Sequence, residues 1–262
     1  MPETTPPPSA TRANILGVAV SAVNLEQTLD TMDAWLADRH PRYICVTPAH
    51  SVMDCHHDPG LRRIFNDSGL TTPDGMSIVW ILRLRGYRNA GRVYGPDLML
   101  ASCARSLERR YRHFLYGGGS ADLETLRGRL QTLFPGLLVA GAYSPAFGPL
   151  TPEEDDLVVR EINRSGADIV WVGLGSPKQE RWMADHLGRI EAPVMVGVGA
   201  AFDFLSGRKP QAPRWMQRTG LEWLFRFASE PRRLWPRYRQ YPLFAMLVLA
   251  QELGLRRYSL DE

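Results

Sequence analysis

Short apolar runs alternate with helix-forming stretches along most of this chain, and this alternation restricts the possible fold more than any other feature. Runs of almost entirely apolar residues occur at 43–46, 113–116, 137–140, 167–173 and 194–198. Strands that are apolar on both sides are typical of a parallel sheet buried between two layers of helices. The pattern therefore predicts an α/β fold with a Rossmann-like, mainly parallel sheet covered by helices. A further strand is predicted over 15–20.

Composition and charge divide the 262 residues into three parts. Residues 1–12 are rich in proline and threonine and lack the pattern of a signal peptide, so we expect a disordered N-terminal segment. Residues 13–207 contain the alternating pattern and form the predicted Rossmann-like core. Residues 208–262 have 11 Lys and Arg against 5 Asp and Glu, a net charge of +6, whereas the rest of the chain has a net charge of −3. We predict that they form a helical, basic C-terminal appendage.

The C-terminal appendage also contains three of the seven tryptophans. Basic residues interleaved with aromatic ones favour an anionic partner, which is either nucleic acid, phospholipid headgroups or a lipid diphosphate. The apolar segment 241–250 is much shorter than the roughly 18 residues that span a bilayer. It predicts a helix that lies at a membrane interface or docks on the core. Three cysteines without close spacing favour a reducing compartment.

The loops that follow the predicted strands are the places for chemistry, because ligands bind such sheets beyond the carboxyl ends of the strands. Thr47 and His50 follow the strand at 43–46. They either contact a ligand or are a helix cap and a surface imidazole. Asp74 precedes Gly75 at the turn into the next predicted helix, where it either caps that helix or acts as a general base.

Two further segments predict anion binding. Arg92 and Asp97 flank a Gly-Pro turn, which indicates either a structural ion pair or recognition of a phosphate or sugar by Arg92. Gly117, Gly118 and Gly119 lie between a predicted strand and a predicted helix, where small residues let the backbone approach a phosphate. The segment lacks a full dinucleotide fingerprint.

The segment from Gly175 to Glu180 contains Ser-Pro-Lys-Gln between these two residues. Ser176 and Gln179 match a capping box with proline at the first helical position. Lys178 is disfavoured in the positive first turn of a helix, and a bound anion such as a nucleotide phosphate would compensate for it. Further along, Asp203 lies between two phenylalanines and is either buried against the backbone or in contact with a ligand. Cys55-His56-His57 has no matching ligand pair elsewhere, so we expect no metal site.

Seven segments, in order from about residue 15 to residue 238, resemble the WecG/TagA/CpsF glycosyltransferases, glycosyltransferase family 26. They are Val-Thr-Pro at 46–48, Thr-Pro-Asp-Gly-Met at 72–76, Arg-Val-Tyr-Gly-Pro-Asp at 92–97, Tyr-Gly-Gly at 116–118, Gly-Leu-Gly-Ser-Pro-Lys-Gln-Glu-Arg-Trp at 173–182, Gly-Val-Gly-Ala-Ala-Phe-Asp at 197–203, and the stretch 212–235. Each segment alone is common, but seven in sequence are specific.

The resemblance implies an inverting, metal-independent transferase without a cofactor. It would move a sugar, of the N-acetylmannosamine, uronic acid or hexose type, from a UDP-sugar to a polyprenyl-diphosphate-linked acceptor in bacterial cell-wall or exopolysaccharide synthesis. Asp74 matches the catalytic aspartate of the family, Thr47 its active-site threonine and Gln179 the glutamine of its Pro-Lys-Gln-Glu motif. The C-terminal appendage matches the part that targets the membrane and approaches the diphosphate. Ala49 stands where many members have asparagine, so the contacts of that loop are expected to differ.

Residues and resemblance together predict a catalytic pair, Asp74 and Thr47, and a set of substrate-binding residues. That set is His50, Gly75, Arg92, Asp97, Gly117, Gly118, Gly119, Gly175, Lys178, Gln179, Glu180, Asp203, Arg226, Arg233 and Arg237. We expect a cytoplasmic enzyme, peripheral on the inner face of the bacterial plasma membrane. Its expected partners are a UDP-sugar, a polyprenyl-diphosphate-linked acceptor, an anionic membrane surface and a second copy of itself, but no nucleic acid. The alternatives are a dinucleotide-dependent oxidoreductase and a nucleic-acid-binding protein that uses the basic appendage.

Overall fold

The computed structural model describes residues 11–146, 148 and 150–260, and its six-stranded sheet confirms the predicted α/β class. The strands lie in the order β4-β3-β8-β7-β5-β6, and every neighbouring pair is parallel. Their bounds are β3 Arg42–Thr47, β4 Leu70–Pro73, β5 Arg112–Gly117, β6 Leu138–Tyr143, β7 Ile169–Gly173 and β8 Val194–Gly197. All these strands therefore end at the same edge of the sheet.

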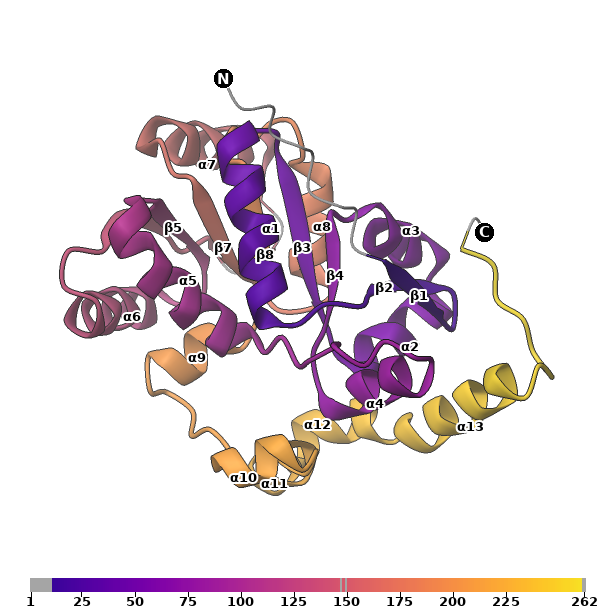
Figure 1. The fold of residues 1–262 in the computed structure, drawn as a ribbon. Coiled ribbons are helices and arrows are strands. Elements are labelled where there is room, and N and C mark those ends of the chain that lie inside the picture. The colour runs from indigo at the N-terminus through magenta and orange to yellow at the C-terminus, as the bar shows by residue number, and fades with distance from the viewer. Residues whose placement is uncertain (1–10, 147, 149, 261–262) are drawn as a thin grey trace.

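Helices cover both faces of the sheet, as the apolar strands require (Figure 1). Their bounds are α1 Leu25–Asp38, α2 Ala49–His57, α3 Pro59–Asp67, α4 Met76–Leu84, α5 Gly95–Arg109, α6 Ser120–Leu133, α7 Pro152–Ser165, α8 Lys178–Asp185 and α9 Ala201–Leu205. Successive residues of a strand belong to two different apolar cores. Val170 of β7 lies in the core with residues of α2, α3, α7 and α8, whereas Trp171 lies in the core with residues of α1, α5 and α6. Successive residues of a strand face opposite sides of a sheet, which explains this division.

The prediction of a single strand over 15–20 is wrong. The segment forms a separate antiparallel hairpin of β1 (Arg12–Ile15) and β2 (Val18–Ser21). Leu16 and Gly17 make the turn at positive φ, and all four residues of β2 are buried, which explains why the run is apolar. Regular structure begins at Arg12, within the segment predicted to be disordered, and residues 1–10 of that segment lie outside the described residues.

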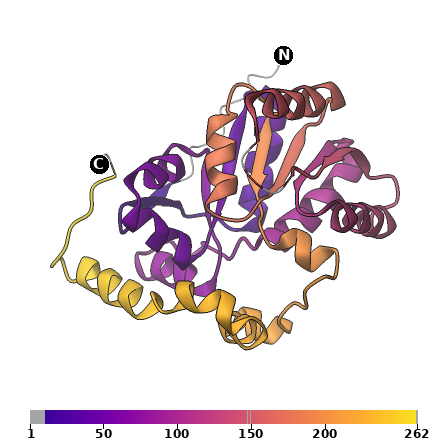
Figure 2. The ribbon, with the colours of Figure 1, turned by 180° about the vertical axis from the view of Figure 1, so that it is seen from behind.

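Four helices build the C-terminal appendage beneath the core, and seen from behind they run along its lower edge (Figure 2). They are α10 Arg214–Arg218, α11 Glu222–Ser229, α12 Pro231–Tyr238 and α13 Tyr241–Glu252. The inner face of α13 is buried, with its apolar side chains beside α2. The Gln251 side chain donates to the carbonyl of Asn14 at 2.8 Å and accepts from the amide of Leu16 at 3.1 Å. Of the two alternatives for segment 241–250, docking on the core is therefore observed.

Gly117 closes β5 against β7, and we expect Gly117→Ala to destabilise the protein strongly. Its φ is +114°, and a Cβ atom there would lie 2.7 Å from the carbonyl carbon of Gly173. The backbone cost of about 1–2 kcal/mol and an overpacking cost of about 1–3 kcal/mol should both appear in urea unfolding. Gly136→Ala is the matched control, because Gly136 also has positive φ but no neighbouring atom within 4 Å of a Cβ. Equal losses in the two variants would show that the strand contact does not require glycine.

Candidate active site

The predicted site residues gather at the carboxyl edge of the sheet. Thr47 ends β3, Asp74 follows β4, and Gly117 and Gly173 end β5 and β7. From β4 to β5, the strand order places a carboxylate at one end of this edge and glycine-rich turns at the other. The edge therefore combines an acidic end with a glycine-rich end.

Asp74 is held at the end of β4 by hydrogen bonds to Thr47 and Arg92. Its amide donates to the carbonyl of Thr47 at 3.0 Å, which ties the two loops together. Gly75, at φ +93°, occupies the N-cap position of α4, so Asp74 does not cap that helix. Instead, Oδ1 of Asp74 accepts from Nε of Arg92 at 3.2 Å. Burial raises the pKa of the Asp74 carboxyl, and the charge of Arg92 opposes this rise.

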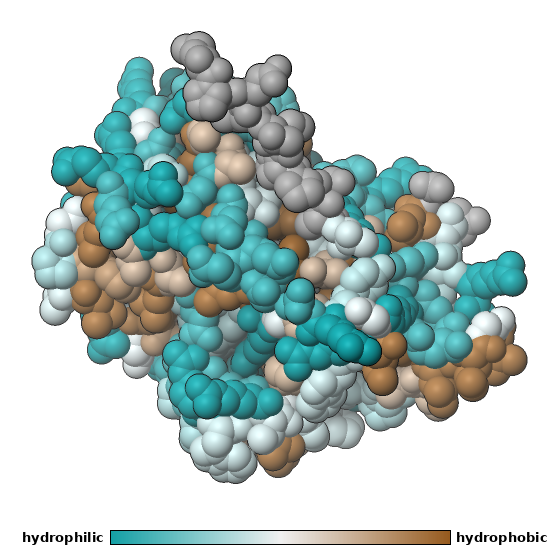
Figure 3. Space-filling view, viewed as in Figure 1, coloured by the Kyte–Doolittle hydropathy of each residue, from teal (hydrophilic) through white to brown (hydrophobic). Residues whose placement is uncertain are grey.

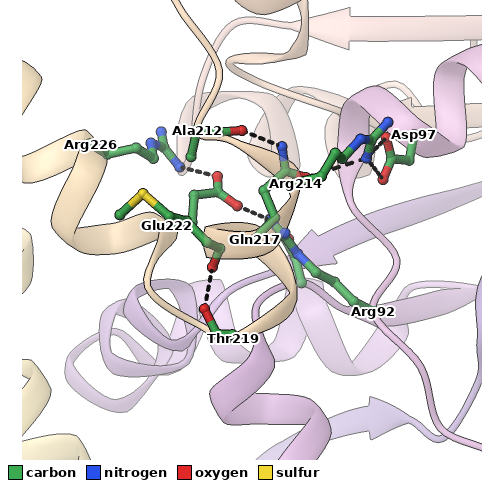
Figure 4. A network of polar contacts seen from close by, with 10 residues as sticks. Arg92, Asp97, Ala212, Arg214, Gln217, Thr219, Glu222 and Arg226 are labelled. Atoms are coloured by element: carbon green, nitrogen blue, oxygen red, sulfur yellow. Dashed lines mark hydrogen bonds and ion pairs between the residues drawn. The ribbon is translucent and has the colours of Figure 1, made fainter.

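Arg92 connects Asp74 to the C-terminal appendage. Its guanidinium lies 4.1 Å from the ring centroid of Tyr94, and its Nη2 donates to Oε2 of Glu222. The predicted pair of Arg92 with Asp97 is wrong as an ion pair. Nη1 of Arg214 donates to both carboxylate oxygens of Asp97 at 2.9 Å, because α10 brings Arg214 to the start of α5 (Figure 4).

Thr47 and His50 lie next to this acidic end. Thr47 is buried, and its hydroxyl donates to the carbonyl of Cys45 at 2.9 Å. His50 lies in the first turn of α2. Burial, followed by the charges of Arg237 and Arg226, lowers the pKa of His50 to about 3, so its imidazole is neutral at physiological pH.

The glycine-rich end consists of Gly117, Gly118, Gly119 and Gly173, and we call this backbone surface the glycine floor. Gly118 has φ +73°, and its carbonyl accepts from the hydroxyl of Ser144 at 2.6 Å. Gly119 occupies the N-cap position of α6, so the first amides of that helix face the edge of the sheet. Gly173 lies against the ring of Phe202, which leaves no room for a side chain. Glycine turns before the N-terminus of a helix are compatible with a phosphate or sugar-nucleotide ligand, which stays a prediction.

The predicted capping box at Ser176 and Gln179 is wrong. The peptide bond between Ser176 and Pro177 is cis, α8 begins at Lys178, and no side chain caps the helix. Gln179 points inward, so it cannot reach back to a cap, and its Nε2 donates to Oε1 of Glu180 at 2.9 Å. Glu180 is fully buried, and burial raises the pKa of its carboxyl.

Lys178 is exposed at the start of α8, on the loop that follows the turn at Gly175. Over the residues that the structure describes, the Lys178 ammonium has no salt bridge to an acidic group. The prediction that an anion binds there is therefore compatible with the geometry.

The remaining predicted residues lie on or beside the appendage. Arg237 donates to the carbonyl of Ser176 at 3.1 Å, and Arg226 lies 4.0 Å from Glu222. Arg233 instead pairs with Glu230 at the start of α12. Asp203 pairs with Lys209 at 3.1 Å and with Arg208, so its partners are side-chain cations and not the backbone.

Glu222 and Arg214 are the residues of this site that sequence reasoning missed. Both come from the appendage, and Glu222 lies 130 positions from its partner Arg92, so no local spacing points to the contact. Arg214 also lines a cavity of about 250 Å³ next to the acidic end. Its lining residues are Met76, Arg92, Asp97, Arg214, Gln217 and Arg218. Within the described residues there is no group of three His, Cys, Asp or Glu that is able to hold a metal ion.

A partly buried carboxylate and glycine turns lie along one strand edge, beside arginines of a docked appendage. The class defined so far is an α/β protein with a candidate active site at the carboxyl edge of its sheet. Comparison with known proteins makes this class specific: the chain belongs to the glycosyl transferase WecG/TagA/CpsF family, whose model matches residues 13–258. The chain is therefore a glycosyltransferase, and this family supports neither the oxidoreductase nor the nucleic-acid-binding alternative.

Two relatives support this assignment. Both are N-acetylglucosaminyldiphosphoundecaprenol N-acetyl-beta-D-mannosaminyltransferases. The protein of Bacillus subtilis (strain 168) is 31% identical over 195 residues, which are 74% of each chain. The protein of Bacillus spizizenii (strain ATCC 23059 / NRRL B-14472 / W23) is 29% identical over 200 residues, which are 76% of each chain.

Proposed function

We propose that this glycosyltransferase moves a sugar of the N-acetylmannosamine type from a UDP-sugar to an N-acetylglucosamine unit linked to a polyprenyl diphosphate. The names of the two Bacillus relatives support this acceptor and this sugar. The observation that carries the proposal is the partly buried Asp74 carboxylate, held by Arg92 at the strand edge that also bears the glycine turns. In bacteria such a transfer belongs to cell-wall or exopolysaccharide synthesis.

The proposed reaction is an inverting transfer in one step. Asp74 takes the proton from a hydroxyl of the acceptor sugar, and the hydroxyl oxygen attacks the anomeric carbon of the donor. The bond between that carbon and the UDP oxygen breaks, and its electron pair leaves with UDP. Attack from the face opposite to UDP inverts the anomeric configuration. Thr47, whose carbonyl accepts from the amide of Asp74, fixes the loop that carries the base.

The departing diphosphate needs positive groups, and we propose that this chain supplies them without a metal ion. Lys178 and the amides at the start of α6 and α8 border the glycine floor. Arg237 donates to the carbonyl of Ser176, beside the start of α8, and Arg226 lies 4.0 Å from Glu222. We propose that these two arginines of the appendage meet the diphosphate of the acceptor.

The acceptor is a lipid, and we propose that the outer face of α13 rests on the membrane that holds it. This face consists of Leu243, Met246 and Leu249 of α13 and of Leu253, the C-cap residue that follows the helix. It is exposed although the inner face of the same helix is buried, and Figure 3 shows apolar surface over this end of the molecule. A helix that is apolar on both faces needs a second apolar contact. In the part of the chain that the structure describes, no helix has the length and apolarity to cross a bilayer.

The test is release of UDP from a panel of UDP-sugars, with N-acetylglucosaminyl polyprenyl diphosphate as acceptor and EDTA present. We expect turnover with one donor of the N-acetylmannosamine type and retention of that turnover in EDTA. Turnover with a different donor would replace the proposed sugar, and turnover lost in EDTA and restored by a divalent ion would overturn metal independence. No release of UDP from any donor, with no thermal stabilisation by UDP, would overturn the proposed reaction.

A further inference from the structure

Glu222 is a buried carboxylate that stands at the contact between the C-terminal appendage and the predicted base. It is the first residue of α11, and its side chain is 11% exposed. Its Oε2 accepts from Nη2 of Arg92, and its Oε1 lies 4.0 Å from Nη1 of Arg226. Figure 4 shows the Glu222 side chain between these two arginines.

A single guanidinium, that of Arg92, is divided between two carboxylates. Nη2 of Arg92 donates to Glu222, and only Nε donates to Asp74, at 3.2 Å. That distance is at the long end of the range for N–H···O hydrogen bonds. Among the described residues, Oδ2 of Asp74 has no hydrogen-bond donor. One oxygen of the base is therefore left for another group.

We propose that Glu222 is a positioning residue of the transfer reaction: it holds Arg92 in a shared arrangement and so prevents Arg92 from forming a full two-bond pair with Asp74. This inference rests on the proposed role of Asp74 as the base. In a full pair, the planar guanidinium would engage both oxygens of Asp74. The acceptor hydroxyl would then find neither a free oxygen nor a strong base.

The charges around Asp74 give this arrangement a measurable consequence. The groups that act on it are Arg92 and Tyr94 from the segment before α5, Glu222 and Arg226 from α11, and Tyr241 from α13. Burial raises the pKa of Asp74, Arg92 lowers it, and Glu222 raises it again. Removal of the Glu222 charge should therefore lower the pKa of Asp74, both directly and because Arg92 becomes free to pair with it.

The test compares Glu222→Gln with the wild-type protein in the dependence of kcat/KM on pH. The acid limb of the profile reports the pKa of the base in the free enzyme. We expect this limb to move to lower pH by roughly 0.5–1 unit, and kcat on the plateau to fall about 10-fold because the base is weaker. KM for the UDP-sugar should stay the same, because Glu222 lies away from the glycine floor.

Glu252→Gln is the matched control. Glu252 is also an appendage carboxylate that pairs with an arginine of the core, since its Oε1 accepts from Nε of Arg85 at 2.7 Å. This variant should leave the acid limb in place. A second comparison uses an Arg92→Gln background, in which Glu222→Gln should shift the acid limb much less because the bridging guanidinium is gone.

An acid limb that stays in place in Glu222→Gln, or that moves to higher pH, would overturn the inference. An equal shift in Glu252→Gln would also overturn it, because appendage docking in general would then be the cause. Carboxyl carbon NMR of Asp74, assigned with Asp74→Asn, reports the same pKa without turnover. If wild-type protein transfers no sugar but this pKa falls in Glu222→Gln, the proposed reaction fails and the positioning of Arg92 stands. If wild-type protein is active and the pKa does not fall, the inference fails alone.

Discussion

Asp74→Asn should reduce kcat by about 10²–10⁴-fold while UDP still binds. The asparagine keeps the size of the side chain and an oxygen for Nε of Arg92, but it cannot take a proton from the acceptor. The glycine floor and Lys178 do not touch residue 74, so the nucleotide site should remain formed. Steady-state turnover gives the first quantity, and the shift of Tm by UDP gives the second.

The same variant should not destabilise the protein at neutral pH. The pKa of Asp74 is raised in the folded state, so folding is favoured most while the carboxyl is protonated. This contribution is complete below the ordinary carboxyl pKa of about 3.9 and is lost as pH rises through the raised value. Asparagine resembles the protonated form and avoids this loss, so Tm near pH 7 should be equal to or above that of the wild type.

Asp156→Asn serves as the control for Asp74→Asn. Asp156 is an exposed carboxylate of α7 that pairs with Arg189 at 2.8 Å, far from the carboxyl edge of the sheet. It should keep wild-type turnover. Turnover within 10-fold of the wild type in Asp74→Asn would remove Asp74 as the base. Loss of UDP binding together with turnover would assign Asp74 to the fold of the site instead.

Hydrophobic pattern alone predicted the part of the molecule that local sequence determines. The apolar runs gave the parallel sheet, because a strand buried on both faces needs apolar residues at every position. The sheet then indicates where the site lies: Thr47 and Gly117 end strands, and Asp74 and Lys178 follow strands, that all finish at one edge. The hairpin of β1 and β2 is not predicted because its second strand, β2, is buried at all four positions and has the same apolar pattern as a strand of the parallel sheet.

Partners of the charged residues were not predictable in the same way. Asp97 was matched with the nearest arginine in sequence, Arg92, but it pairs with Arg214, 117 positions away. Likewise, Glu222 reaches Arg92 only because the appendage folds back under the core. The sequence contains 29 arginines and two lysines, so each carboxylate has many arginines as possible partners. Which arginine it meets depends on the tertiary structure. A local rule failed at Gln179 too, because the side chain turns inward to Glu180 instead of capping α8.

Replacing the outer face of α13 with glutamates should abolish most binding to anionic vesicles. The triple variant Met246→Glu, Leu249→Glu and Leu253→Glu changes side chains that are 63%, 58% and 63% exposed. Insertion of three such side chains into the membrane interface is worth roughly 3 kcal/mol or more. Each added negative charge near an anionic surface costs about 1 kcal/mol further. Together these terms predict a loss of at least about 100-fold in vesicle partitioning, measured by sedimentation.

Folding of the triple variant should be nearly unchanged. The contacts that hold α13 on α2 come from its other face, through Phe244, Leu247 and Val248. Glutamate is a good helix former, and substitutions at exposed positions usually change stability by less than about 0.5 kcal/mol each. The Glu252 pair with Arg85 also remains. Tm therefore separates a loss of membrane contact from a loss of docking.

Activity measured on two acceptors then distinguishes membrane contact from chemistry. A long-chain acceptor in vesicles should be used poorly by the triple variant, whereas a short-chain, water-soluble acceptor should be used at the wild-type rate. Leu107→Glu, Leu133→Glu and Leu157→Glu form the matched control, since these leucines are 40–61% exposed on α5, α6 and α7 of the core. Equal losses of activity on both acceptors would show that the outer face of α13 is needed for catalysis itself. Unchanged vesicle binding would show that this face does not contact the membrane.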